Sequence, residues 1–138
     1  MSFPARRRDR PSESAVTTVR TSASITVPAG SEVTLATVTG TGTLVYAVYF
    51  TDSYDVALKI YCDGVLSLVV NLSVLYDMGY GASTPGLQLL RYDTANNVYV
   101  AGVTVPLPFR KALMINAFNL GTASHSVQLR NAVIHQQA

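Results

Sequence analysis

The residues that most often carry out covalent chemistry are few in this sequence and stand far apart. It contains two histidines, His125 and His135, and one cysteine, Cys62. No serine stands in the glycine-flanked turn that exposes the nucleophile of many hydrolases. A catalytic triad would require these scattered side chains to meet through the fold alone. We therefore predict no catalytic site and no enzymatic activity, and we expect Cys62 to be a small core residue.

The acidic residues suggest little metal chemistry. Asp52 and Asp55, in the polar stretch 51–55, could present two carboxylates to a hard cation, but calcium usually takes six to eight oxygen ligands. Two histidines and one cysteine are too few to favour a zinc site. Gly40-Thr41-Gly42 resembles the start of a dinucleotide-binding loop but lacks the third glycine and the following helix. We predict neither a metal ion nor a cofactor.

The aromatic residues are better candidates for binding. The sequence has eight tyrosines and no tryptophan. Tyrosines in strands usually pack into the core with the hydroxyl at its rim, whereas exposed rings on one face can stack on sugars or bases. Tyr54, Tyr76 and Tyr80 fall in expected loops. We therefore expect these three residues to bind a ligand or to be buried by a neighbouring subunit.

The most unusual stretch is residues 1–14, MSFPARRRDRPSES. It holds four of the ten Lys and Arg residues, whereas residues 21–138 carry five basic and six acidic residues. Arginine donates bidentate hydrogen bonds to carboxylates, and an apolar residue nearby can anchor such a segment. We predict an extended N-terminal arm that clamps a partner surface, through the residues Phe3, Arg6, Arg7, Arg8 and Arg10. Weak, salt-sensitive contact of the arm with nucleic acid stays open as an alternative.

The elements that must position these residues are all expected to be strands. Asp63-Gly64 is a typical type I′ hairpin turn, and residues 71–86 indicate a long loop with at most a short helical turn. Pro106-Leu107-Pro108 is expected to end its strand and to prevent further pairing. We predict a single domain over residues 15–138, an antiparallel β-sandwich or jelly roll of about eight or nine strands. The expected strands are 16–25, 32–39, 44–50, 56–61, 65–70, 87–92, 98–105, 112–118 and 126–134.

Composition narrows the class of protein further. Only 13% of the residues are charged, against about 25% in an ordinary soluble domain, so part of the surface is expected to be covered by neighbours. A single cysteine rules out an intrachain disulfide and fits synthesis in a reducing compartment. The N-terminus lacks the apolar core of a secretion signal, and the longest apolar run, residues 65–70, is too short to cross a bilayer. We expect synthesis in the cytoplasm and no membrane partner.

Three segments of the first half resemble a known family. They are Ser24-Ile25-Thr26-Val27-Pro28-Ala29-Gly30, Thr39-Gly40-Thr41-Gly42-Thr43-Leu44 and Lys59-Ile60-Tyr61-Cys62-Asp63-Gly64-Val65. Over about residues 20–70 the chain resembles the small β-sandwich virion proteins of tailed bacteriophages, although Cys62 departs from the β-branched residue more usual there. The resemblance implies a structural component of a virus particle that is present in many copies.

Together these observations predict a virion structural protein, either a capsid decoration protein or a minor capsid component. The expected partners are copies of itself or a major capsid or tail protein, and the expected location is the virion, after synthesis in the host cytoplasm. A tail, connector or collar component is one alternative. A carbohydrate-binding β-sandwich used in host adsorption is the other.

Overall fold

The predicted all-β sandwich is confirmed in a computed structural model, which describes residues 16–137 and the side chains of residues 23–136. Residues 16–137 contain ten strands and one short helix, one strand more than the upper expectation. Their bounds are β1 (Val16–Val27), β2 (Glu32–Thr39), β3 (Gly42–Thr51), β4 (Val56–Cys62), β5 (Val65–Val70), α3 (Leu72–Asp77), β6 (Leu87–Asp93), β7 (Val98–Val103), β8 (Leu107–Phe109), β9 (Ala112–Asn119) and β10 (His125–Gln137).

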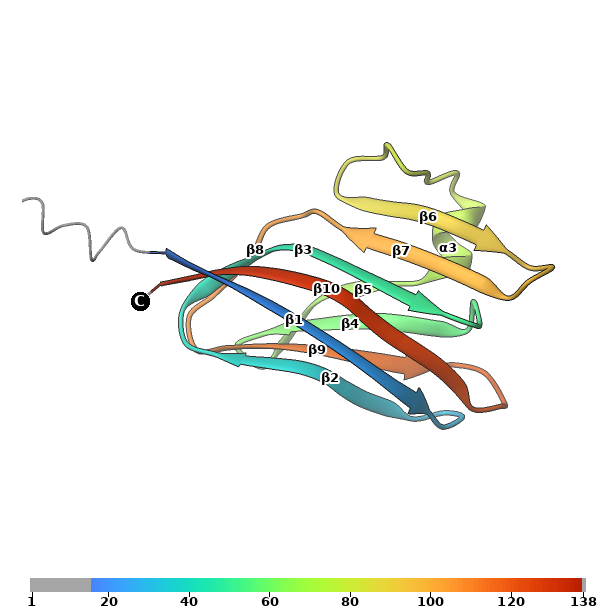
Figure 1. Ribbon diagram of the computed structural model, residues 1–138, viewed down its shortest axis with the longest axis horizontal. Coiled ribbons are helices and arrows are strands. Elements are labelled where there is room, and N and C mark those ends of the chain that lie inside the picture. Colours follow the sequence, from blue (N-terminus) through green and yellow to red (C-terminus); the bar gives the residue numbers. More distant parts are fainter. Residues whose placement is uncertain (1–15, 138) are drawn as a thin grey trace, which may run out of the picture.

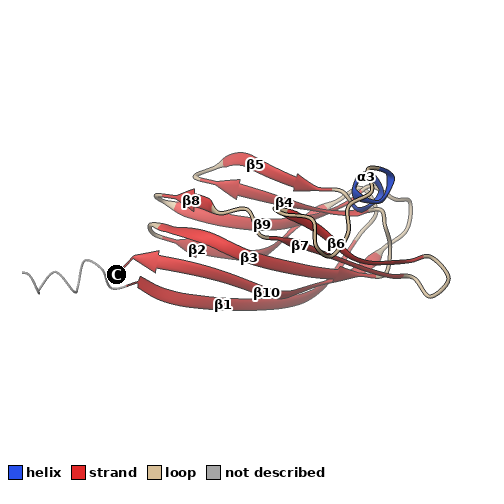
Figure 2. Ribbon diagram, turned by 90° about the horizontal axis from the view of Figure 1, so that it is seen from above, coloured by secondary structure: helices blue, strands red, loops and turns tan. Residues whose placement is uncertain are grey.

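The strands form two antiparallel sheets with the topology of a jelly roll. The first sheet has the order β1-β10-β3-β7-β6, with β8 also paired to β3, and the second has the order β2-β9-β4-β5. Four pairs are nested in sequence: β1 with β10, β2 with β9, β3 with β7, and β4 with β5. The chain is thus one long antiparallel hairpin rolled into two sheets, to which β6 and β8 are additions. Figure 2 shows β5 along the margin of the molecule opposite β1.

The core lies between the sheets and follows from the alternation of side chains along each strand. In β9, for example, Leu113, Ile115 and Ala117 point inward and are at most 1% exposed. Tyr49 is also fully buried, and its hydroxyl donates a hydrogen bond to the carbonyl of Val56 at 3.0 Å. Burial of each large apolar side chain stabilises the fold by roughly 1.5–3 kcal/mol, so this continuous core holds the two sheets together.

Asp63 fixes one end of the sandwich. Positive φ angles at Asp63 (55°) and Gly64 (82°) fit the predicted type I′ turn between β4 and β5. The Asp63 carboxylate accepts hydrogen bonds from the backbone N–H groups of Lys111 (2.6 Å), Arg110 and Ala112. These bonds lower the pKa of Asp63, and the bond from Lys111 has the largest effect. The β4–β5 hairpin is therefore tied to the turn between β8 and β9.

One local expectation differs from the structure. Residues 107–109, expected to be unpaired, form β8 and pair with β3, with Pro108 opposite Thr43. A proline lacks the N–H donor but keeps its carbonyl acceptor, so it is tolerated in a three-residue strand at the margin of the sheet. The short helical turn that the sequence allowed within residues 71–86 is α3, which Asn71 caps by accepting a hydrogen bond from the N–H of Val74.

The sandwich has two distinct ends, which Figure 1 shows at the right and left. At the first end lie α3 and the connections β3–β4, β6–β7 and β9–β10. At the second end lie the turns β4–β5 and β8–β9, the start of β1 and the end of β10. No helix among residues 16–137 is long and apolar enough to span a membrane.

Candidate functional site

Four tyrosines contact one another at the first end of the sandwich. The rings of Tyr76 and Tyr92 stack with centroids 4.1 Å apart and planes inclined by 15°. Tyr54 lies 6.1 Å from Tyr92 in a stacked orientation. Tyr99 meets Tyr54 and Tyr92 edge to face, at 5.7 and 5.0 Å. The last three separations are in the range of about 4.5–7 Å that is favourable for aromatic pairs, and the stack of Tyr76 on Tyr92 is closer. We name Tyr54, Tyr76, Tyr92 and Tyr99 the tyrosine cluster.

The β6–β7 hairpin, α3 and the β3–β4 connection bring the cluster together. Tyr92 on β6 and Tyr99 on β7 are register partners across a hairpin, whose turn contains Asn97 with a positive φ of 54°. The carboxylate of Asp93 holds that turn by accepting hydrogen bonds from the N–H groups of residues 95 and 96. The other two rings come from α3 and from the β3–β4 connection, which the fold places at the same end.

The cluster has a buried base and an exposed rim. Tyr99 is 1% exposed, whereas Tyr54 and Tyr76 are 44% and 56% exposed. Burial, followed by the neighbouring tyrosines and the carboxylates of Asp93 and Asp55, raises the pKa of the Tyr99 hydroxyl. The exposed rings can therefore contact a partner without rearrangement of the buried ones.

A polar depression of about 400 Å³ lies beside the cluster. In it, Asp52 Oδ1 lies 3.2 Å from His125 Nδ1. The lining residues are Asp52, Ser53, Tyr54, Asp55, Asn96, Asn97, Tyr99 and His125. Carboxylates, amides and an aromatic ring in one hollow can bind cationic groups or polyols.

Asn119, at the end of β9, positions the turn that carries His125. It is fully buried, and its Nδ2 donates hydrogen bonds to the carbonyls of Val27 (2.9 Å) and Ala123 (2.7 Å). Its Oδ1 accepts a hydrogen bond from the N–H of Gly121 at 2.8 Å. One side chain thus joins the β9–β10 turn to the end of β1, close to the depression.

The structure brings together only some of the residues that the sequence singled out. Tyr54 and Tyr76 both belong to the cluster, whereas Tyr80 is half-buried and packs against the hydrophobic core. Sequence reasoning missed Tyr92 and Tyr99, which it treated as ordinary strand tyrosines. The signal that could have found them is the short gap between the expected strands 87–92 and 98–105, because a hairpin there places the two tyrosines opposite each other.

The predicted arm residues Phe3, Arg6, Arg7, Arg8 and Arg10 lie outside the described residues. What the structure does describe is the surface of the folded domain to which such an arm could bind.

The acidic pair considered for a cation, Asp52 and Asp55, lines the polar depression. Within residues 16–137, no three His, Cys, Asp or Glu side chains are grouped closely enough to hold a metal ion. Asp52 is directed to His125.

A second polar group lies on the outer face of the second sheet. Glu32 accepts hydrogen bonds from Asn116 Nδ2 (2.6 Å), Tyr61 OH (2.7 Å) and Lys59 Nζ (3.2 Å). These bonds lower the pKa of Glu32, and the bond from Asn116 has the largest effect. The Lys59 ammonium also lies 4.3 Å from the ring centroid of Phe118. Because the group links β2, β9 and β4, its evident role is structural.

Strand β5 is a free and uncharged margin of the second sheet. Among the described residues it pairs only with β4. Val65, Leu66 and Val69 are 65%, 45% and 42% exposed, and none of its six residues is charged. Natural proteins usually protect such edges with charge, proline or a covering segment. An unprotected apolar edge is therefore a candidate contact surface.

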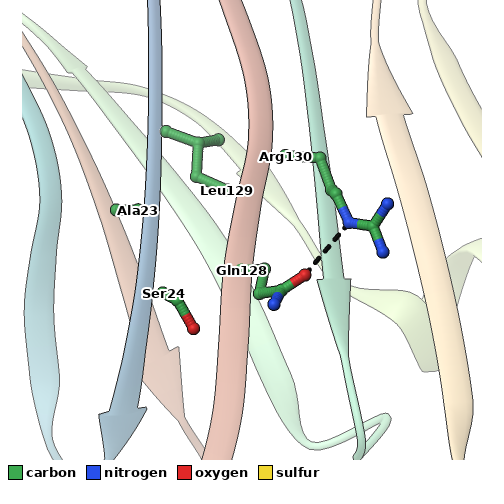
Figure 3. A pocket seen from close by; sticks show the side chains of 5 residues that line it. All are labelled: Ala23, Ser24, Gln128, Leu129 and Arg130. Carbon is green, nitrogen blue, oxygen red and sulfur yellow. Dashed lines mark hydrogen bonds between the residues drawn. The ribbon is translucent and has the colours of Figure 1, made fainter.

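A shallow hollow on the first sheet has less potential as a site. It measures about 410 Å³ and lies where β1 and β10 are both bulged. Figure 3 shows Arg130 beside it, with Nε donating to Gln128 Oε1 at 3.0 Å. The Arg130 guanidinium lies over the ring of Phe50, 4.8 Å from its centroid. Its charged group is already engaged within the domain.

Comparison with models of known protein families finds no match, and neither does comparison with curated proteins.

Proposed function

We propose that this protein is a structural subunit of a virus particle, a capsid decoration protein or minor capsid component that packs in several copies. The observation that carries the proposal is strand β5, a six-residue edge with three exposed apolar side chains and no charge. Contact with another subunit would remove the apolar side chains of this strand from water and would cover its unpaired backbone edge. The jelly-roll architecture, which many capsid proteins share with lectins and cupins, is compatible with this role but does not establish it.

In this proposal the N-terminal arm clamps neighbouring subunits. The low overall charge suits a domain that packs through apolar surface, and the concentration of arginine in residues 1–14 suits an arm that binds through charge. A position in the tail, connector or collar would use the same surfaces and differs only in the partner.

The native mass tests the proposal. We expect the full chain to self-associate in sedimentation or light-scattering measurements, and deletion of residues 1–14 to leave a soluble folded domain that no longer joins its assembly. In a matched pair, Leu66→Lys on the free edge should weaken association, whereas Thr37→Lys, an exposed position on β2, should not. A full chain that is monomeric at every accessible concentration would refute the proposal.

A second candidate function is carbohydrate binding, and the exposed rings of Tyr54 and Tyr76 beside the polar depression favour it. Aromatic faces next to carboxylates and amides are suited to sugar rings. A glycan array tests this function: Tyr76→Ala should abolish binding, whereas Tyr46→Ala, on the other side of the first sheet, should not. Absence of binding across a broad glycan set would contradict it.

A further inference from the structure

The two ends of the sandwich differ in chemistry as well as in shape. The first end presents the tyrosine cluster, whose exposed rings are surrounded by carboxylates. The second end presents Arg110 and Lys111, whose backbone N–H groups bind Asp63. Residues 1–15 are attached at this second end, because Val16 lies opposite Gln137 and β10 there pairs with Gly42. Val16, where the arginine-rich segment is attached, and the aromatic surface thus lie at opposite ends of the described domain (Figure 1).

Four of the six acidic residues of the domain lie around the tyrosine cluster. Asp52 and Asp55 line the depression next to Tyr54 and Tyr99. Asp93 follows Tyr92 on β6, and Asp77, which follows Tyr76 on α3, is close enough to influence the pKa of Tyr92. The basic side chain that contacts this group is Arg91, which pairs with Asp93 at 3.2 Å. Among the described side chains, no Lys or Arg pairs with the other three carboxylates.

The chemistry of this surface matches that of the arm. Guanidinium groups form bidentate hydrogen bonds with carboxylates and stack on aromatic faces, so arginine is better suited than lysine to a surface that offers both. Residues 6–10 supply four arginines and one aspartate. Phe3 supplies an apolar ring that can pack beside Tyr54 or Tyr76.

Within its own domain the arm cannot bring all four arginines to the tyrosine cluster. The cluster lies beyond the Val27 end of β1, where Val27 pairs with His125. The 12 residues of β1 extend over about 36 Å. Fully extended, Arg10 reaches at most about 22 Å from Val16, and Arg6 about 36 Å. Arg10 therefore falls short by about 14 Å, which is more than the length of its side chain, so all four arginines can meet one cluster only on a neighbouring molecule.

We infer that residues 3–10 of one copy bind the tyrosine cluster and the surrounding carboxylates of a neighbouring copy. The inference rests on the proposed function, since it requires that copies pack together. The contact joins different surfaces of the two partners. Two antiparallel copies that exchange arms satisfy it as a two-fold dimer, and copies that pass the arm in one direction form a ring or an open row of subunits.

A charge-swap experiment on the full chain tests the inference. In the first variant, Asp52→Lys and Asp77→Lys reverse the charge around the cluster. In the second, Arg6, Arg7, Arg8 and Arg10 are replaced by Glu. Each exposed ion pair is worth up to about fivefold in affinity, so the first variant should raise the self-dissociation constant by about tenfold or more. The second variant should have an effect at least as large.

The decisive measurement is the equimolar mixture of the two variants, by sedimentation velocity with a reductant present to keep Cys62 from cross-linking. Each variant alone places like charges opposite each other, whereas the mixture pairs opposite charges in both directions. We expect the mixture to form larger species than either variant alone. The matched control, Thr37→Lys with Thr39→Lys near the second end, should associate as the wild-type chain does. Circular dichroism checks that every variant is folded.

The possible failures are distinguishable. If the wild-type chain associates and Asp52→Lys with Asp77→Lys leaves association unchanged, the inference is overturned while the proposed function stands. The same holds if both variants dissociate and their mixture does not recover. A wild-type chain that never associates overturns both. Glycan binding that Tyr76→Ala abolishes, with association unchanged, would assign the surface to carbohydrate instead.

Discussion

Replacing Asn119 by Asp should destabilise the protein in a pH-dependent way, although the two side chains have nearly the same shape. The amide of Asn119 donates to two carbonyls and accepts one N–H, and the side chain is fully buried. A carboxylate keeps the acceptor for Gly121 but turns the two donors into an acceptor that faces two carbonyl oxygens. Loss of two hydrogen bonds costs about 2 kcal/mol, and the buried negative charge costs more.

Protonation sets the upper limit of that further cost. The carboxyl group can avoid ionisation by binding a proton, which at pH 7 costs about 4 kcal/mol for a group with an unfolded pKa near 3.9. The folded state of the variant then has a raised pKa and binds more protons than the unfolded state. Its stability is therefore greatest below about pH 4 and falls as the pH rises toward the folded pKa, by up to about 1.4 kcal/mol per unit.

We expect Asn119→Asp to lose up to about 6 kcal/mol at pH 7 and about 2 kcal/mol near pH 4, relative to the wild type at the same pH. Urea unfolding followed by circular dichroism at several pH values measures both quantities. Asn119→Ala is the control: it loses three hydrogen bonds, about 3 kcal/mol, with no dependence on pH. If Asn119→Asp were as stable as the wild type at pH 7, or if its deficit did not change with pH, the assigned hydrogen bonds would be wrong.

Three other changes should have simpler effects. Tyr49→Phe removes a buried hydroxyl and should lower the free energy of unfolding by about 1–2 kcal/mol in denaturant titrations. Gly42→Ala should lower the melting temperature, because its Cβ would lie 2.8 Å from the carbonyl oxygen of His135, whereas Gly81→Ala, with open space around it, should not. The pKa of Asp63 is lowered in the folded state, so its contribution is present above the unfolded pKa and is lost as pH falls through the folded value. Asp63→Asn should therefore reduce the loss of wild-type stability below about pH 4, and an unchanged acid profile would contradict the role of its three backbone partners.

The strands were predictable because their residues carry the signal locally. Alternation in β9 and the Asp63-Gly64 turn depend on neighbours within a few residues, so the pattern identifies them directly. The jelly-roll order was not predictable to the same degree, because the pairing of β1 with β10 joins residues more than 90 positions apart. The tyrosine cluster depends on that order, since its members come from three connections that only the completed sandwich places at one end. For the same reason Tyr80 could not be separated from Tyr76 by sequence, although one packs on the core and the other is exposed.

The pairing of β1 with β10 also limits when the protein can fold during its synthesis. Strand β1 cannot complete its sheet until residues 125–137 have left the ribosome, because Val27 pairs with His125 and Val16 with Gln137. At 5–20 residues per second, the intervening 97 residues take roughly 5 to 20 s to make. During that interval the apolar strands already synthesised lack β10, so the first sheet can be completed only late in synthesis. Slow translation or truncated chains should therefore be more harmful to this protein than to one built from local hairpins.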